Sequence, residues 1–229
     1  MNLAILYRIM AHQREVTKPH NRGVGRLHVE FLVEELSTQE ALENILPRIF
    51  REDTSFKIHS YRGKTDLVSK LPSRLKGYKE WIPADWKIVI LVDEDREKCL
   101  LLKQKLENIA ADAGLITKSK AGGNQNFQVL TRIAVEELEA WFFGDVKAIT
   151  TAYPKVSHNL ATQAKYRNPD AIPGGTWEAL ERVMQQAGYH RGGLEKVKAA
   201  RDISTHMNPG DNRSRSFQVF YCSILDIIN

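Results

Sequence analysis

Short apolar segments alternate with helix-like apolar spacing along the first two thirds of the chain. Runs rich in β-branched and aromatic residues predict strands at 27–33, 56–61, 87–92 and 127–135. Apolar residues that recur every three or four positions predict helices at 38–50, 66–78, 96–113 and 136–143. Strands that alternate with helices form parallel sheets through right-handed crossovers. The pattern therefore predicts an α/β fold with a four-stranded parallel sheet flanked by helices.

Individual residues add detail to these helices. Ser37 or Thr38 is expected to cap the first helix, and Pro72 falls in the middle of the second, where proline removes a backbone hydrogen bond. The residues of the third helix expected to face the core are Leu100, Leu101, Leu106 and Ile109. The aromatic group Trp141, Phe142 and Phe143 is expected to pack in the core rather than to stack on nucleobases.

The last third of the chain has a different pattern. Proline and glycine interrupt residues 154–175, and apolar spacing then predicts helices at 176–186, 194–203 and 216–228. We therefore divide the chain into a basic N-terminal arm at 1–26, an α/β domain at 27–155 and a helical C-terminal region at 156–229.

Composition narrows the class of protein. The 229 residues are 42% hydrophobic and 27% charged, as in a globular protein, and no apolar segment approaches the length that spans a bilayer. The start of the chain lacks the apolar core of a signal peptide. These features predict a cytoplasmic protein with no membrane partner. Cys99 and Cys222 are expected to be reduced thiols in helices.

The net charge of +5 is unevenly distributed. Acidic residues gather near 34–43, 93–97 and 136–139, whereas lysine and arginine concentrate in the N-terminal arm, at 62–79 and at 182–215. Acidic clusters within a basic surface are typical of an enzyme that uses a metal to act on phosphodiesters.

The most informative segment is Lys87–Asp95, KIVILVDED. Its apolar run predicts a strand buried on both faces, so Asp93 and Asp95 stand at the carboxyl end of that strand and point the same way. Ligands of open α/β sheets bind at these ends. The pair suits two interpretations equally well, either a cap for the next helix or a site for a cation.

Acidic residues also follow two other predicted strands. Glu34 and Glu35 come directly after the first, and Glu136, Glu137 and Glu139 come directly after the fourth. Parallel strands bring all these carboxylates to one edge of the sheet, where divalent cations would offset their mutual repulsion. Because no histidine or cysteine accompanies them at ligand spacing, we expect Mg²⁺ or Mn²⁺ rather than zinc.

Four segments together resemble the Toprim domain, shared by topoisomerases, bacterial primases and OLD-family nucleases. They are VEELSTQEAL, RGKTDL, LVDEDREKC and RIAVEELEAWFFGD, which lie within residues 27–155. More closely, they look like an uncharacterised Toprim-like prokaryotic family that resembles OLD-type nucleases and is suspected of roles in phage defence. The resemblance implies a Toprim-like parallel sheet and metal-dependent chemistry on nucleic acid.

The resemblance also implies roles for single residues. Glu34 would bind metal or act as the acid–base group, and Asp93 and Asp95 would be metal ligands. Glu137 and Glu139 would occupy the later acidic position, where OLD-like nucleases place a further ligand. The chain departs from the Toprim pattern at Glu35, which stands where glycine is common, and at Glu40, a second acid that falls late. The roles of Glu35 and Glu40 therefore stay open as possible additional acids.

OLD-like nucleases are also expected to use a lysine that stabilises developing charge. Lys64 is the first candidate because it follows the second strand, and Lys198 is the second, on a C-terminal helix that also carries Lys196. Residues expected to hold the nucleic-acid backbone are Arg62, Arg201, Arg213 and Arg215. For each of these cations the commoner role is that of a solvated surface charge.

Together these features favour a Mg²⁺-dependent Toprim-like nuclease that hydrolyses phosphodiester bonds of DNA or RNA. The alternative is a non-catalytic or regulatory Toprim-fold subunit that acts with a separate ATPase, since the chain has no Walker A sequence of its own. Primase-like nucleotidyl transfer ranks third because no zinc-ribbon or helicase-binding module is present.

Overall fold

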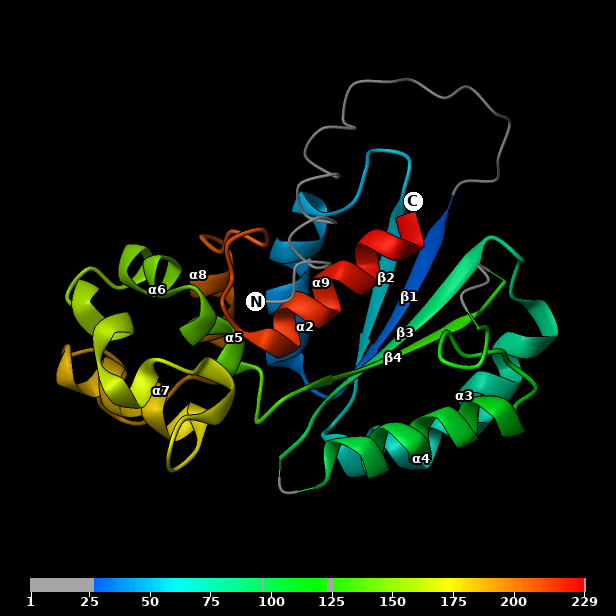
Figure 1. Ribbon diagram of the computed structural model, residues 1–229, viewed down its shortest axis with the longest axis horizontal. Helices are drawn as coiled ribbons and strands as arrows, with labels where there is room; N and C mark the ends of the chain where they lie inside the picture. The colour runs from blue at the N-terminus through cyan, green and yellow to red at the C-terminus, as the bar shows by residue number, and fades with distance from the viewer. Residues whose placement is uncertain (1–26, 96, 123–125, 229) are drawn as a thin grey trace.

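The structure is a computed structural model that describes residues 27–95, 97–122 and 126–228 (Figure 1). Its sheet has the strand order β2-β1-β3-β4, with every pair parallel. The strands are β1 His28–Val33, β2 Ser55–Ser60, β3 Trp86–Asp93 and β4 Val129–Ala134. The predicted four-stranded parallel α/β sheet is therefore confirmed. The N-terminal arm at 1–26 lies outside the described residues.

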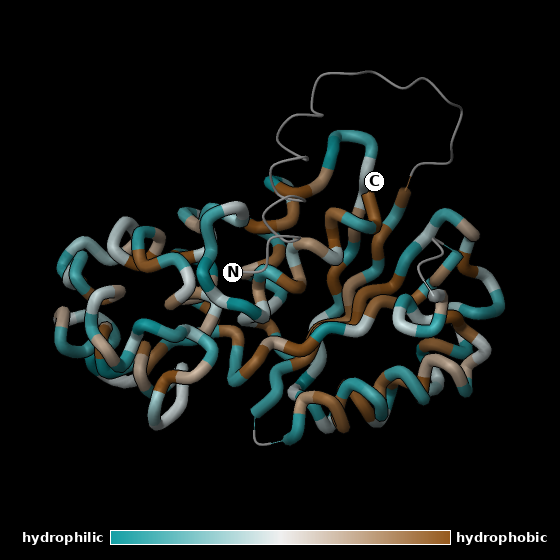
Figure 2. Tube along the Cα trace, in the orientation of Figure 1, coloured by the Kyte–Doolittle hydropathy of each residue, from teal (hydrophilic) through white to brown (hydrophobic). Residues whose placement is uncertain are grey.

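Helices cover both faces of this sheet. Helices α3 (Lys64–Trp81) and α4 (Cys99–Asp112) bury one face against Leu32, Ile88 and Ile90. Helices α2 (Leu36–Ile45) and α9 (Arg215–Ile228) cover the other, where the buried residues include Phe31 and Val89. Successive strand residues thus serve opposite faces, and Figure 2 shows the central strands as largely hydrophobic.

A helical region lies beside the carboxyl ends of the strands (Figure 1). It contains α5 Glu139–Gly144, α6 Val146–Ala152, α7 Thr176–Gln186 and α8 Lys196–Ser204, with 3-10 helices η2 His158–Thr162, η3 Ala164–Tyr166 and η4 Pro169–Ala171. Asn44 on α2 donates to the Arg201 carbonyl and the Ser204 hydroxyl of α8, at 3.2 and 3.0 Å. One buried apolar cluster joins this region to the sheet, and the boundary drawn at 155 stays a prediction.

Helix ends differ from the predicted ones at several places. The first helix ends at Ile45 and continues only as the 3-10 helix η1 (Leu46–Arg48), because Pro47 has no N–H to donate. Glu35, rather than Ser37 or Thr38, occupies its N-cap position. The second helix is longer than expected and runs through Pro72 without interruption.

The prediction that Leu100 and Leu101 face the core is wrong. Helix α4 begins at Cys99, and its phase buries Leu102 and Leu106 while Leu100 and Leu101 are 81% and 67% exposed. The aromatic group at 141–143 is buried, as predicted. Cys99 and Cys222 are free thiols on α4 and α9. None of the described helices is both long and apolar enough to cross a membrane.

Candidate functional site

Asp93 ends β3 and lies at the centre of an acidic group on the carboxyl edge of the sheet. It is 8% exposed and points to the same face as Val89 and Leu91, toward α2 and the helical region. The register pairs Val33 of β1 with Leu91, so β3 extends past the end of β1 and Glu34 reaches the end of β3. The backbone N–H of Asp93 donates to Glu34 Oε2 at 3.2 Å.

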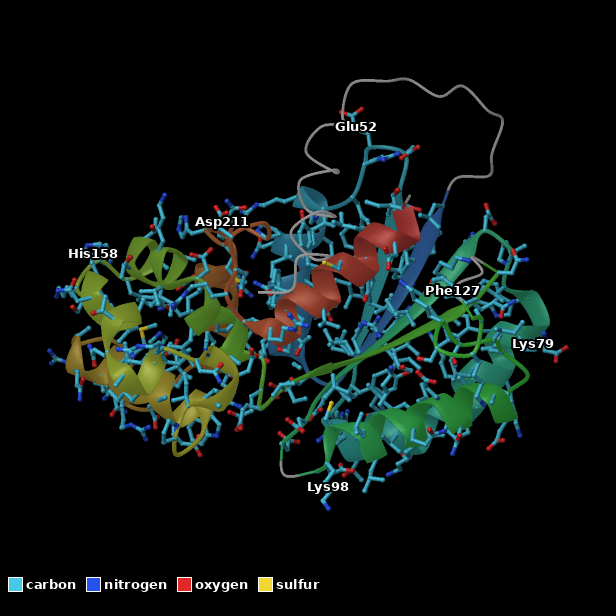
Figure 3. The ribbon with its side chains drawn as sticks, in the orientation of Figure 1. Glu52, Lys79, Lys98, Phe127, His158 and Asp211 are labelled. Atoms are coloured by element: carbon cyan, nitrogen blue, oxygen red, sulfur yellow. The ribbon has the colours of Figure 1, made fainter. Side chains whose placement is uncertain are left out.

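Glu94, rather than Asp93 or Asp95, caps the helix that follows β3. Its Oε1 accepts from the N–H of Cys99, the first residue of α4, at 3.0 Å. Its Oε2 accepts from the N–H of Glu136 at 3.4 Å. Lys98, which marks this end of α4 in Figure 3, is the formal N-cap residue and contributes no side-chain cap. Capping therefore does not explain Asp93 and Asp95.

Asp95 and Glu136 hold strained backbone conformations beside each other. Their φ angles are 52° and 61°, and the N–H of Asp95 donates to the Glu136 carbonyl at 3.0 Å. Left-handed φ disfavours residues that carry a Cβ, and such strain concentrates at functional sites. Lys64, the first residue of α3, places its Nζ 2.6 Å from Asp95 Oδ2 and donates to the Glu94 carbonyl at 3.1 Å.

Glu139 begins α5 and is the buried acid that follows β4. It is 2% exposed, and burial raises its pKa to about 7. Lys196 Nζ lies 4.0 Å from Glu139 Oε1 and opposes that rise. Burial lowers the pKa of Lys196, but the negative charges of Glu139 and Glu35 outweigh this effect and raise it. Lys196 thus faces the acidic group from α8.

Electrostatics show that the carboxylates of different strands share one environment. Burial raises the pKa of Asp93 well above its usual value, and the charges of Glu139, Glu34, Glu35 and Asp95 raise it further. Burial also raises the pKa of Glu34, although the N–H donated by Asp93 opposes that change. Holding all these groups ionised is unfavourable, so the site favours a proton or a cation.

The remaining predicted acids have other contacts. Glu137 Oε2 accepts from Thr176 Oγ1 at 2.8 Å and from the Trp177 N–H at 2.9 Å, so it caps α7. Glu35 accepts a hydrogen bond from Ser37 Oγ at 2.6 Å, and its negative charge helps to raise the pKa of Asp93. Glu40 pairs with Arg201 at 2.7 Å.

The predicted basic residues also separate into different places. Lys198 Nζ lies 4.0 Å from the exposed Glu195, and its side chain is more exposed than that of Lys196, which lies beside Glu139. The exposed residue Arg62 lies two residues before α3, and the exposed residue Arg215 begins α9. The N–H of Arg213 donates to the Gly144 carbonyl at 2.9 Å. Of these cations, only Lys64 and Lys196 contact the carboxylates that follow β3 and β4, through Asp95 and Glu139, respectively.

The donor set fits a hard divalent cation in its chemistry. Carboxylate oxygens are the ligands that Mg²⁺ and Mn²⁺ prefer. A bound divalent cation would offset the mutual repulsion of Glu34, Asp93 and Glu139. Within the described ranges, however, no three His, Cys, Asp or Glu side chains already stand close enough to hold a metal ion. Binding would therefore require these side chains to close around the ion.

Fold and site together define an α/β protein with a parallel sheet whose carboxyl edge carries buried carboxylates flanked by lysines. Residues 33–225, more than half of the chain, match the family described as a domain of unknown function, DUF4276, and the chain belongs to this family. A comparison with curated proteins finds no match.

Among solved structures, the chain is similar to the C-terminal region of the OLD protein of Xanthomonas campestris pv. campestris. The TM-score is 0.45 and the identity 15%, over 87% of this chain and 95% of that chain. A likeness at this level transfers no residue's role to this protein.

Proposed function

We propose that this protein is a divalent-metal-dependent nuclease of the Toprim-like class that hydrolyses phosphodiester bonds in DNA or RNA. The observation that carries the proposal is Asp93, a buried carboxylate whose pKa is raised by burial and by neighbouring carboxylates from the ends of β1 and β4. The Toprim-like motifs in the sequence support the same function, including the expectation of a role in phage defence.

Glu34, Asp93 and Glu139 are the residues that would hold Mg²⁺ or Mn²⁺. A bound divalent ion supplies Lewis-acid polarisation of a phosphoryl oxygen and lowers the pKa of a bound water. Asp95 is a fourth donor, available when Lys64 releases it from their 2.6 Å ion pair. Glu137 is the weakest candidate because its carboxylate caps α7.

Lys64 and Lys196 flank the carboxylates from opposite sides. Lys64 comes from the start of α3 and is 13% exposed, whereas Lys196 comes from α8 and is 34% exposed. Each ammonium group offsets part of the negative charge of the carboxylate beside it. Both groups can also turn toward phosphate oxygens. We propose that they orient the substrate phosphate and offset its charge.

The test compares the full chain with Asp93→Asn. We expect the unmodified chain to cleave plasmid, single-stranded DNA or tRNA in Mn²⁺ or Mg²⁺, and the variant to lose at least about a hundredfold of the rate. Titration with Mn²⁺, followed by electron paramagnetic resonance, gives a second readout that is independent of turnover. Asp112→Asn, at the exposed end of α4, is the matched control. Equal cleavage and equal Mn²⁺ binding in both variants would remove the catalytic proposal.

One observation favours a second candidate, a regulatory Toprim-fold subunit that acts with a separate ATPase. Lys64 and Lys196 already compensate part of the charge of Asp95 and Glu139, as expected of a site that needs no metal. This candidate predicts that the chain neither cleaves nucleic acid nor binds Mn²⁺, and that Asp93→Asn leaves its assembly with an ATPase partner unchanged.

A further inference from the structure

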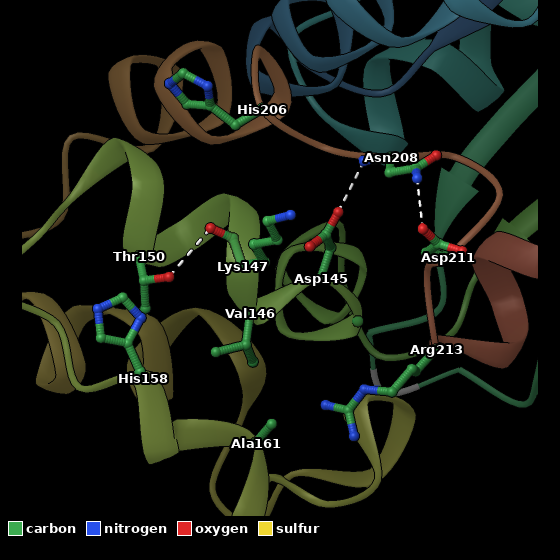
Figure 4. A pocket seen from close by; sticks show the side chains of 11 residues that line it. Asp145, Val146, Lys147, Thr150, His158, Ala161, His206, Asn208, Asp211 and Arg213 are labelled. Atoms are coloured by element: carbon green, nitrogen blue, oxygen red, sulfur yellow. Dashed lines mark hydrogen bonds between the residues drawn. The ribbon is translucent and has the colours of Figure 1, made fainter.

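A cavity of about 440 Å³ lies in the helical region, on the opposite end of α5 from Glu139 (Figure 4). Its wall is formed by α6, the 3-10 helix η2 and the segment 206–213. The lining residues that bear on its chemistry are Asp145, Lys147, His158, His206, Asn208 and Arg213. The acidic edge of the sheet contributes no residue to it.

The segment that carries Arg213 is fixed by hydrogen bonds to two backbone carbonyls of α5. The N–H of Arg213 donates to the Gly144 carbonyl at 2.9 Å, and Asn212 Nδ2 donates to the Trp141 carbonyl at 2.7 Å. A Cβ at Gly144 would lie 1.9 Å from Asn212 Oδ1 and 2.8 Å from the Ser214 nitrogen, so only glycine permits this approach. The cavity wall is therefore a built feature and not a loose surface loop.

The acidic side chains of the cavity are already hydrogen-bonded. Asp145 accepts from the N–H of Ala148 at 3.1 Å and from that of Asn208 at 2.8 Å. Asp211 Oδ2 accepts from Asn208 Nδ2 at 2.5 Å. Backbone donors thus compensate Asp145, and the two hydrogen bonds that fix the position of Asn208 are the dashed lines to Asp145 and Asp211 in Figure 4.

The cationic and imidazole side chains, by contrast, have donors to spare. Among the described residues, Lys147, His158, His206 and Arg213 form no ion pair, and the Arg213 guanidinium donates only weakly to the Phe143 carbonyl at 3.4 Å. The guanidinium points into the cavity in Figure 4. An arginine fork, a lysine and imidazole N–H groups around one hollow are the donors that bind a phosphate group.

We propose that this cavity binds one phosphate group of a nucleic-acid strand whose cleaved bond lies at the acidic edge. The inference rests on the proposed nuclease function and extends it to how the substrate is held. Helix α5 connects the two places, since Glu139 begins it and Gly144 ends it. At about 1.5 Å per residue, its ends lie within about 10 Å along the axis, a distance that a few nucleotides span.

The test measures binding without turnover. A fluorescein-labelled single-stranded oligonucleotide is titrated with the full chain in EDTA and followed by anisotropy at several salt concentrations. We expect Arg213→Ala to weaken binding about tenfold, as for loss of one charged hydrogen bond, and to lower the salt slope by about one. Arg213→Lys should retain the slope. Arg167→Ala, which removes an exposed arginine of the same region outside the cavity, should bind as the unmodified chain does.

The outcomes separate this inference from the proposed nuclease function. Weaker strand binding by Arg213→Ala, with Arg167→Ala binding as the unmodified chain does, supports the cavity. Equal binding by Arg213→Ala and the unmodified chain overturns the cavity even where cleavage is observed. Direct binding of adenosine monophosphate that depends on Arg213, without Arg213-dependent strand binding, also overturns it, because the phosphate would then come from a free nucleotide. Absence of cleavage with Arg213-dependent strand binding counts against the nuclease alone.

Discussion

Replacing Glu139 by glutamine should stabilise the metal-free protein at alkaline pH. Burial raises the pKa of Glu139 from its usual 4.5 to about 7, so the folded chain holds a proton that the unfolded chain has lost between these values. Stability therefore falls as pH rises through this range and stays low above it. Glutamine keeps the size of the side chain and removes the charge.

The magnitude follows from the size of the pKa change. At about 1.4 kcal/mol for each tenfold in the ionisation equilibrium, a rise from 4.5 to about 7 corresponds to about 3 kcal/mol. For a chain of this length, that is an increase of about 6–12 °C in the melting temperature. This is an upper value, because the buried amide of glutamine needs hydrogen-bond partners of its own.

The assay is thermal unfolding by circular dichroism in EDTA, from pH 5 to pH 8. The melting temperature of Glu139→Gln should exceed that of the unmodified chain most at pH 8. The difference should shrink toward pH 5. Glu80→Gln, on the exposed surface of α3, should differ from the unmodified chain by less than about 0.5 kcal/mol throughout. The reasoning would be refuted if the two melting temperatures were equal at pH 8, or if they differed by the same amount at pH 5 and pH 8. Added Mg²⁺ should reduce the difference in melting temperature, because it binds the folded unmodified chain better than it binds folded Glu139→Gln.

Two further predictions concern the backbone around the site and the cavity. Gly144→Ala should lower the free energy of unfolding by about 1–3 kcal/mol, because its Cβ would overlap Asn212 Oδ1; urea unfolding measures this, and a neutral effect would show that the segment moves freely. Glu136→Gly should be more stable than Glu136→Ala by about 1 kcal/mol, because only glycine adopts the φ of 61° without strain. The two variants lose the same charge, so equal denaturation midpoints would rule out backbone strain at this position.

Much of the acidic edge could be predicted from the sequence, for a physical reason. Uninterrupted apolar runs have to be buried on both faces, and their alternation with helices requires parallel strands. Parallel strands end on the same edge, so Glu34, Asp93 and Glu139 meet wherever such a sheet forms.

The helix phases and the contacts of the side chains could not be predicted. Leu100 and Leu101 fit an apolar stripe, but the start of α4 at Cys99 turns them toward solvent. Equally, no local pattern distinguishes Glu94, which caps α4, from its neighbour Asp93. Periodicity fixes which residues share a helix face and leaves open which face meets the core.

The sequence by itself determined the succession of strands and helices, the parallel direction of the strands and the edge at which the acids gather, because these follow from local periodicity and chain connectivity. The strand order β2-β1-β3-β4 came from the tertiary structure. Only the tertiary structure decided that Lys196, and not Lys198, faces those acids. That choice depends on how α8 packs on α2, where Asn44 binds the Arg201 carbonyl across a separation of 157 residues. Contacts between such distant segments arise from packing of whole surfaces, which no short window of sequence encodes.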